Sequence, residues 1–129
     1  MRFSDWTETN QFKANVLKLK DKYEFITLEE AHRHLKRDRL RLKDYAVMTS
    51  DDGWASLKNI LPWLEEQEIP VTLFVNPNYA DGLSFREKET ERYMTRSEME
   101  SYKQVSTGLH GLEHINVAKM SETEFRDYV

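Results

Sequence analysis

The chain has 129 residues, a length typical of one domain, and 39% of them are hydrophobic while 33% are charged. Its net charge of −4 argues against the basic surface that nucleic-acid binding requires. It contains no cysteine, which excludes disulfides, thiolate metal sites and cysteine nucleophiles.

Targeting signals are absent from the chain as written. The amino terminus lacks the apolar region of a secretory signal, and no stretch approaches the roughly 18 apolar residues of a membrane span. We therefore expect a soluble chain, cytoplasmic if it is complete at its amino terminus. No internal repeat or Pro/Gly-rich linker divides the chain, so residues 1–129 are expected to form a single domain.

The first third of the chain predicts a helix, a strand and a second helix in that order. Residues 7–20 are weakly helical and polar, and residues 22–27 alternate in the manner of a short strand. Thr27 and Glu30 have the spacing of a capping box that opens the next helix. The apolar run at 45–49, bounded by charge, predicts a strand buried on both faces.

A helix and the clearest strand follow. Apolar residues recur at the spacing of a helix packed on a sheet, at Leu57, Ile60, Leu61 and Leu64. Pro62 interrupts this pattern and should kink or loosen the helix. Residues 70–76 are rich in β-branched and aromatic side chains and predict a strand, and residues 77–93 predict a polar loop.

The last third repeats the alternation. Ser97 is expected to start a short helix, residues 104–110 have the length of a strand, and Ser121 with Glu124 forms a second capping box before a final helix. Strands that alternate with helices imply right-handed βαβ units and a parallel sheet, and therefore an α/β fold. In such folds the chemistry gathers at the carboxyl ends of the strands.

Two histidines stand at one such strand end. His110 and His114 are four residues apart, so both imidazoles can face one ion on a helix or a tight loop. An isolated pair with this spacing is more often incidental than a metal site. His32 and His34 lie in a charged helix and are interpreted as ordinary surface residues.

Two aspartates stand at another strand end. Asp51 and Asp52 could share a site with the histidines only if the chain bends there, which Gly53 permits. One aspartate and two histidines would be the three protein ligands of an open metal site, with the second aspartate as a base. The alternative is that the pair caps the helix beginning near Trp54, although one aspartate would suffice for that.

Two motifs in this chain resemble the signatures of a known family. The stretch "TSDDG" at 49–53 resembles the T-F-D-D-G motif of the polysaccharide deacetylases, the NodB-homology carbohydrate esterases. The stretch "IPVTLFV" resembles the strand that follows in that family, and "HGLEH" at 110–114 resembles its H-[ST]-x-x-H motif. The resemblance extends over most of residues 22–129.

The resemblance implies a fold, a cofactor and a role for each matching residue. It implies a distorted, TIM-barrel-like (β/α) barrel with a divalent ion, zinc being the expected metal, held by Asp52, His110 and His114. Asp51 matches the catalytic base, which would accept a proton from water as that water attacks an amide. The implied activity is removal of acetyl groups from N-acetylated polysaccharides or oligosaccharides, a metal-dependent hydrolysis of carbon–nitrogen bonds.

The chain departs from the family pattern in two motif positions and in length. Ser50 replaces an aromatic residue, and Gly111 replaces a Ser or Thr whose hydroxyl would steady the histidine loop. A complete barrel needs roughly 200 residues or more, and no candidate for the family's later motifs, including its general acid, is present. We therefore expect the amino-terminal part of a barrel, incomplete for turnover, with an open sheet edge that favours self-association.

Two further functions remain open. One is a relative of the same fold that binds metal or glycan without catalysis, and the other is a cytoplasmic metal amidohydrolase of small substrates. The expected partner is a glycan or a small amide. Trp54 and Tyr79 lie just past strand ends and are candidates to stack on sugar rings, although aromatic residues belong to the core by default.

Overall fold

The computed structural model describes residues 6–36, 44–80, 92–111 and 116–128. Helices and strands alternate along them, as the sequence predicts. The elements are α1 (Trp6–Lys20), β1 (Glu24–Phe25), α2 (Leu28–Lys36), β2 (Tyr45–Ala46), β3 (Met48–Asp52), the 3-10 helix η1 (Ala55–Asn59), α3 (Leu61–Glu66), β4 (Val71–Val75), α4 (Arg96–Glu100), β5 (Val105–Leu109), the 3-10 helix η4 (Val117–Lys119) and α5 (Glu122–Tyr128).

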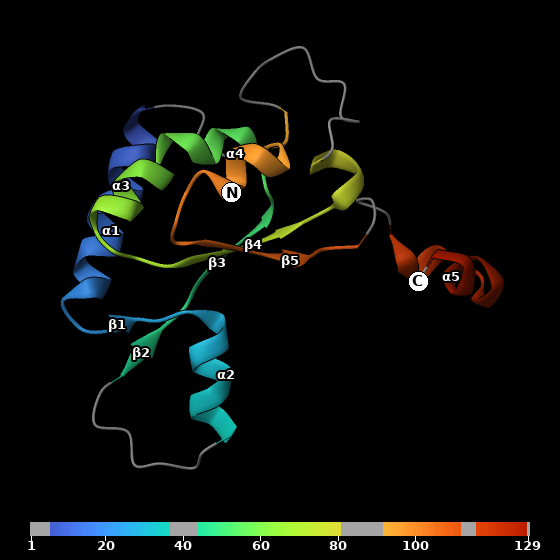
Figure 1. The fold of residues 1–129 in the computed structure, drawn as a ribbon, viewed down its shortest axis with the longest axis horizontal. Coiled ribbons are helices and arrows are strands. Elements are labelled where there is room, and N and C mark those ends of the chain that lie inside the picture. The colour runs from blue at the N-terminus through green and yellow to red at the C-terminus, as the bar shows by residue number, and fades with distance from the viewer. Residues whose placement is uncertain (1–5, 37–43, 81–91, 112–115, 129) are drawn as a thin grey trace.

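All described strand pairs are parallel, which confirms the α/β class. A three-stranded sheet has the order β3-β4-β5, and a small second sheet pairs β1 with β2. Because the strands are parallel and in register, Asp51 lies beside Phe74 and Phe74 lies beside Gly108. The carboxyl ends of β3, β4 and β5 therefore meet at one edge of the sheet, near the end of β5 in Figure 1.

The apolar run at 45–49 differs from its prediction as a strand buried on both faces. It is divided between β2 and β3, with Val47 between them, and its residues are half-buried except for exposed Thr49. The reason is the position of β3 in the sheet. Among the described strands, β3 pairs only with β4, so it is an edge strand and its side chains have neighbours within the sheet on one side only.

The core lies between the three-stranded sheet and the helices α1, α3 and α4, which cover one face of it (Figure 1). Leu61, Leu64 and Leu73 are fully buried there, and Val16 of α1 joins the same cluster. The predicted helix at 57–64 is broken into η1 and α3 at Ile60, with Pro62 in the first turn of α3. A proline is tolerated at that position because the first amides of a helix have no intrahelical partner.

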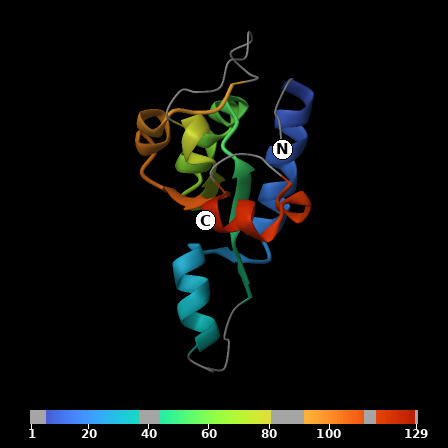
Figure 2. The same cartoon turned by 90° about the vertical axis from the view of Figure 1, so that its right-hand side faces the viewer.

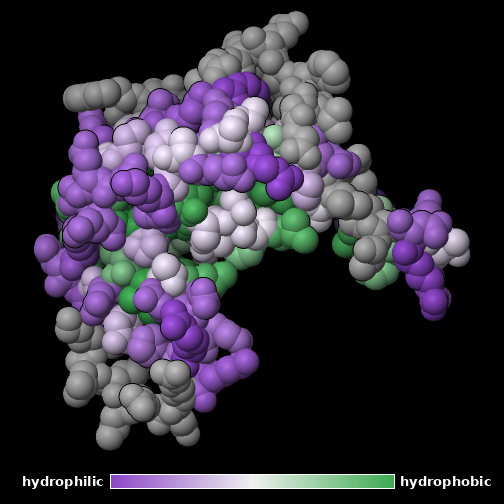
Figure 3. Space-filling model, in the orientation of Figure 1, coloured by the Kyte–Doolittle hydropathy of each residue, from purple (hydrophilic) through white to green (hydrophobic). Residues whose placement is uncertain are grey.

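The opposite face of the three-stranded sheet has no helix against it among the described elements, and we call it the open face. Figure 2 shows α2 extending away from the sheet, and α5 also projects from the body in Figure 1. In Figure 3 polar side chains cover the upper helices, while apolar surface is visible between these helices and α2. Within the described ranges, no helix has both the length and the apolarity to cross a membrane.

Both predicted capping boxes are present. The Thr27 backbone amide donates to the Glu30 carboxylate at 2.9 Å, and the Glu30 amide donates to the Thr27 hydroxyl at 3.1 Å. The Ser121 amide donates to the Glu124 carboxylate at 2.7 Å in the same way. These contacts satisfy amides that would otherwise lack partners at the start of each helix.

The start of α4 differs from the prediction. The capping residue is Thr95 rather than Ser97, and Glu98 completes the box. Glu98 also receives hydrogen bonds from Arg92 at 2.6 Å and from Lys58 at 3.0 Å. The Arg92 guanidinium, with help from the Thr95 amide and Lys58, holds the pKa of the Glu98 carboxyl well below its usual range.

We expect Glu98→Gln to lower stability by roughly 1–3 kcal/mol at pH 7, because it removes charge-assisted hydrogen bonds. The folded-state pKa lies below the ordinary value of 4.5, so this stabilisation is complete above that pH and is lost as the pH falls below it. Urea unfolding of both proteins between pH 3 and 7 tests this, and their difference should shrink at low pH. Glu100→Gln, an exposed change on the same helix, is the control.

Candidate metal site and its surroundings

The chain turns sharply where β3 ends. Asp52 and Gly53 have φ angles of 70° and 69°, both in the left-handed region. A Cβ atom on Gly53 would lie 2.8 Å from Cγ1 of Val75, so the position needs glycine for its space as well as for its backbone angle. This turn lies where the sequence requires a bend if Asp51 and Asp52 are to share a site.

The turn places the Asp52 carboxylate beside His110. Its Oδ1 lies 3.5 Å from Nε2 of His110, although the two residues belong to different strand ends. Its Oδ2 accepts a hydrogen bond from Nε1 of Trp54 at 3.2 Å. The Asp52 side chain is 19% exposed, although its Oδ1 is buried, and the His110 side chain is 39% exposed.

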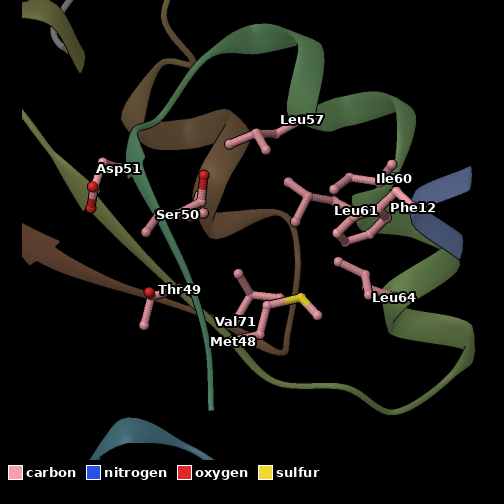
Figure 4. Close-up of a pocket in the computed structure, with 11 residues that line it drawn as sticks. Phe12, Met48, Thr49, Ser50, Asp51, Leu57, Ile60, Leu61, Leu64 and Val71 are labelled. Atoms are coloured by element: carbon pink, nitrogen blue, oxygen red, sulfur yellow. The ribbon is translucent and has the colours of Figure 1, made fainter. Parts of the chain in front are cut away.

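The Asp51 side chain leaves β3 on the side away from the helices. Figure 4 shows the Asp51 and Thr49 side chains on one side of β3 and those of Ser50 and Met48 on the side of the helices. All four residues are among those that line a cavity of about 250 Å³. Asp51 is exposed on the open face. Asp51, Phe74 and Gly108 are register partners, so the Phe74 side chain points to the same face as Asp51. The Phe74 ring fills the space on that face that a Cβ atom on Gly108 would occupy.

The aspartates do not act as the helix cap that the alternative interpretation proposes. The capping residue of η1 is Trp54, in an extended conformation, and no side chain makes a cap hydrogen bond there. The two carboxylates are therefore not explained by the needs of the helix that follows them.

Backbone and side-chain contacts from β4 hold His110. Its amide donates to the Val75 carbonyl oxygen at 2.8 Å. The buried Asn76 side chain donates from Nδ2 to the carbonyl oxygens of His110 and Gly111. Asn76 is not among the site residues predicted from the sequence, although it is a polar residue directly after the strongest strand, at the end where functional sites gather.

Two of the three predicted metal ligands are thus brought together. His114, the third, lies outside the described residues, and the described residues contain no group of three or more His, Cys, Asp or Glu side chains able to hold a metal. A carboxylate oxygen next to an imidazole nitrogen is a donor set that suits zinc and similar divalent ions. The residues that are described therefore fit such an ion in their chemistry.

Three aromatic rings stack next to this site. The Trp54 and Tyr93 rings have centroids 4.3 Å apart, and those of Tyr93 and Tyr79 are 4.6 Å apart. Trp54 is only 6% exposed, so its ring is packed in the fold rather than presented as a platform. Its indole N–H nevertheless reaches Asp52, and this contact orients the carboxylate.

Sequence comparison identifies one family model. The model described as polysaccharide deacetylase matches residues 39–129, well over half of the chain. This range includes the turn at Asp52 and the segment at His110. No curated protein sequence matches the chain significantly.

Structure comparison finds deacetylases with the same fold. The deacetylase PplD of Streptococcus pyogenes, solved with acetate, has a TM-score of 0.74 at 23% identity over 93% of this chain and 52% of its own. IcaB of Ammonifex degensii has a TM-score of 0.69 at 22% identity over 93% of this chain and 55% of its own. The BpsB deacetylase domain of Bordetella bronchiseptica has a TM-score of 0.60 at 19% identity, covering 81% of this chain and 43% of its own. The chain therefore spans about half the length of the first two structures and has the fold of that part.

Proposed function

Because this chain belongs to the polysaccharide deacetylase family, we propose that it carries the metal-binding part of an enzyme that removes acetyl groups from N-acetylated polysaccharides or oligosaccharides. The observation that carries the proposal is the 3.5 Å approach of Asp52 to His110 at neighbouring strand ends within the matched range. Residues this far apart in sequence meet here through the parallel pairing of β3, β4 and β5.

The proposed ligands are Asp52, His110 and His114, and zinc is the expected ion. When bound, the ion supplies Lewis-acid polarisation of the amide carbonyl and of the attacking water. Asp52 holds its position through the Trp54 indole, which leaves Oδ1 directed at His110. The left-handed turn at Asp52 and Gly53 aims the carboxylate toward the end of β5.

Asp51 is the proposed general base. Its carboxylate is exposed on the open face, directly next to the proposed ligand Asp52 in sequence. There it can accept a proton from water as the water attacks the amide carbon. The group that protonates the leaving amine has no candidate in this chain, so we propose that turnover requires residues beyond it.

The first test is metal binding. We expect one equivalent of Zn²⁺ in calorimetric titration, and at least a roughly 100-fold loss of affinity in Asp52→Asn, because losing a ligand should cost more than losing an outer partner of one. Asp44→Asn makes the same chemical change at an exposed position and should bind as the wild type does. Equal affinities in both variants would contradict the assignment of Asp52.

A non-catalytic relative that binds metal or glycan is the second candidate. It is favoured because the residues of this chain include no candidate for the group that protonates the leaving amine. Acetate release from chito-oligomers and from small amides, with and without a chelator, separates the candidates. Chelator-sensitive release from the oligomers supports the deacetylase, release from small amides alone supports an amidohydrolase, and binding without release supports the non-catalytic relative.

A further inference from the structure

Asn76 follows β4 directly, and its side chain is fully buried. Its Nδ2 donates to the His110 carbonyl oxygen and, over 3.4 Å, to that of Gly111. Both neighbours are acceptors, so the orientation of the amide follows from chemistry, since a flipped side chain would set its own oxygen against two carbonyl oxygens. One buried side chain directly after β4 thus forms hydrogen bonds with two consecutive residues of the segment that follows β5.

The rest of the Asn76 side chain makes its burial costly. Its Oδ1 is buried and has no hydrogen-bond partner among the described residues. Burying a side-chain amide whose oxygen has no hydrogen-bond partner is less favourable than burying an apolar side chain of similar size. Packing alone would therefore favour a residue such as leucine at this position. What asparagine provides and leucine does not is the two hydrogen bonds donated by Nδ2.

Asn76 also does not use its side chain as a helix cap. Its backbone carbonyl accepts from the amides of Tyr79 and Ala80 at 3.0 and 3.1 Å, which starts the helical turn at 77–80. An asparagine in that place commonly accepts an amide of the turn with its side-chain oxygen. Here the side chain reaches across to the end of β5 instead.

Gly111 completes the arrangement. Its φ angle is 77°, a left-handed conformation that glycine adopts without strain. This backbone path leaves the Gly111 carbonyl within reach of Asn76. The chain has glycine where the resemblance expects a hydroxyl residue, and the buried amide supplies a tether to the same segment from a different strand.

We propose that Asn76 is a positioning residue that holds the His110 backbone so that the imidazole lies against Asp52. The inference rests on the proposed metal site for its functional meaning, because His110 is a proposed ligand. The structural part of the proposal does not depend on a metal. Without the Asn76 side-chain amide, the His110–Gly111 segment loses the hydrogen bonds that hold it, and the hydrogen bond from the His110 amide to the Val75 carbonyl oxygen opens more often.

The first experiment measures hydrogen exchange of the metal-free protein by NMR. In Asn76→Ala the His110 amide should exchange at least tenfold faster, while amides within the β4–β5 ladder keep their protection. Asn76→Leu fills the same space but lacks the hydrogen-bond donor, so the His110 amide should exchange faster in this variant as well. The leucine variant provides the test if the alanine variant folds poorly. Unchanged exchange of His110 in both variants would overturn the proposal.

Thr72→Val is the matched control. Thr72 is a buried polar residue of the same strand, and its hydroxyl contacts that of Ser106 on β5 at 2.9 Å, away from the site. The change removes one side-chain hydrogen bond between β4 and β5 while the volume of the side chain stays nearly constant. If Thr72→Val accelerated His110 exchange as much as Asn76→Ala does, a general weakening of the sheet would explain the result, and the proposal would fail.

The second experiment is a thermodynamic cycle on Zn²⁺ affinity. Asn76→Leu should weaken binding by about 10–100-fold, as loss of an outer partner of a metal ligand does. In a His110→Ala background the same change should have little further effect, because Asn76 acts through His110. An equal loss of Zn²⁺ affinity in both backgrounds would show that Asn76 does not act through His110. Failure of the wild type to bind Zn²⁺ would count against the proposed function alone, since hydrogen exchange would still decide the role of Asn76.

Discussion

Asp51→Asn is expected to reduce kcat for acetate release by about 10²–10⁴-fold, the range that a general base contributes, when it is measured with the further residues that we propose turnover requires. Asparagine has the shape of aspartate but does not accept a proton at neutral pH. Zn²⁺ affinity should stay close to that of the wild type, because Asp51 is exposed on the open face and is not one of the proposed ligands. Initial rates with chito-oligomers and calorimetric titration of the same preparation measure the two effects.

The same variant separates a functional role from a structural one. Two adjacent carboxylates repel, so removing the charge of Asp51 should leave the thermal midpoint of the metal-free protein equal or higher. A residue needed for folding would show the opposite. Asp44→Asn again serves as the control for loss of one exposed charge. Wild-type turnover by Asp51→Asn would remove Asp51 from the mechanism.

Gly53→Ala should destabilise the chain by roughly 2–5 kcal/mol. The left-handed backbone costs an L-residue about 1–2 kcal/mol, and overpacking of a buried position adds roughly 1–3 kcal/mol. The clash is specific, because the new Cβ would lie 2.8 Å from Cγ1 of Val75. Urea unfolding measures the loss, and a change below about 1 kcal/mol would show that the turn relaxes at little cost.

A double variant separates the two contributions at Gly53. Val75→Ala removes the atom that the new Cβ would meet, so Gly53→Ala should cost less in that background than in the wild type. The remaining cost is that of the backbone angle. Zn²⁺ affinity should fall in Gly53→Ala in both backgrounds, because a changed φ at Gly53 also moves the preceding Asp52. Additive effects on stability would mean that Val75 does not limit the position.

Local patterns were sufficient for most elements. The β-branched run at β4 and the capping boxes at Thr27 and Ser121 depend on neighbours within a few residues, and all three occur as predicted. The helix breaks just before Pro62, near where the pattern indicates, because a proline fits the first turn of a helix but not its interior. The parallel arrangement also follows from the alternation of strands and helices.

The start of α4 shows where local information ends. Ser97 with Glu100 and Thr95 with Glu98 both have the spacing of a capping box, so the sequence alone allows either. The structure uses Thr95, because Glu98 also reaches Arg92 and Lys58. Lys58 lies 40 residues away in sequence, and its contribution depends on how η1 packs near α4.

The sequence by itself determined the chemical types at the site: an aspartate pair before a glycine at one strand end, and a histidine at another. Their order and spacing also carried the resemblance to the deacetylases. Only the tertiary structure decided which atoms meet. Parallel pairing through β4 brings Asp52 to His110, the left-handed turn aims the carboxylate, and the buried Asn76 bonds the segment that carries the histidine. Contacts between residues more than thirty positions apart depend on strand register and burial, which arise only when the whole sheet is assembled.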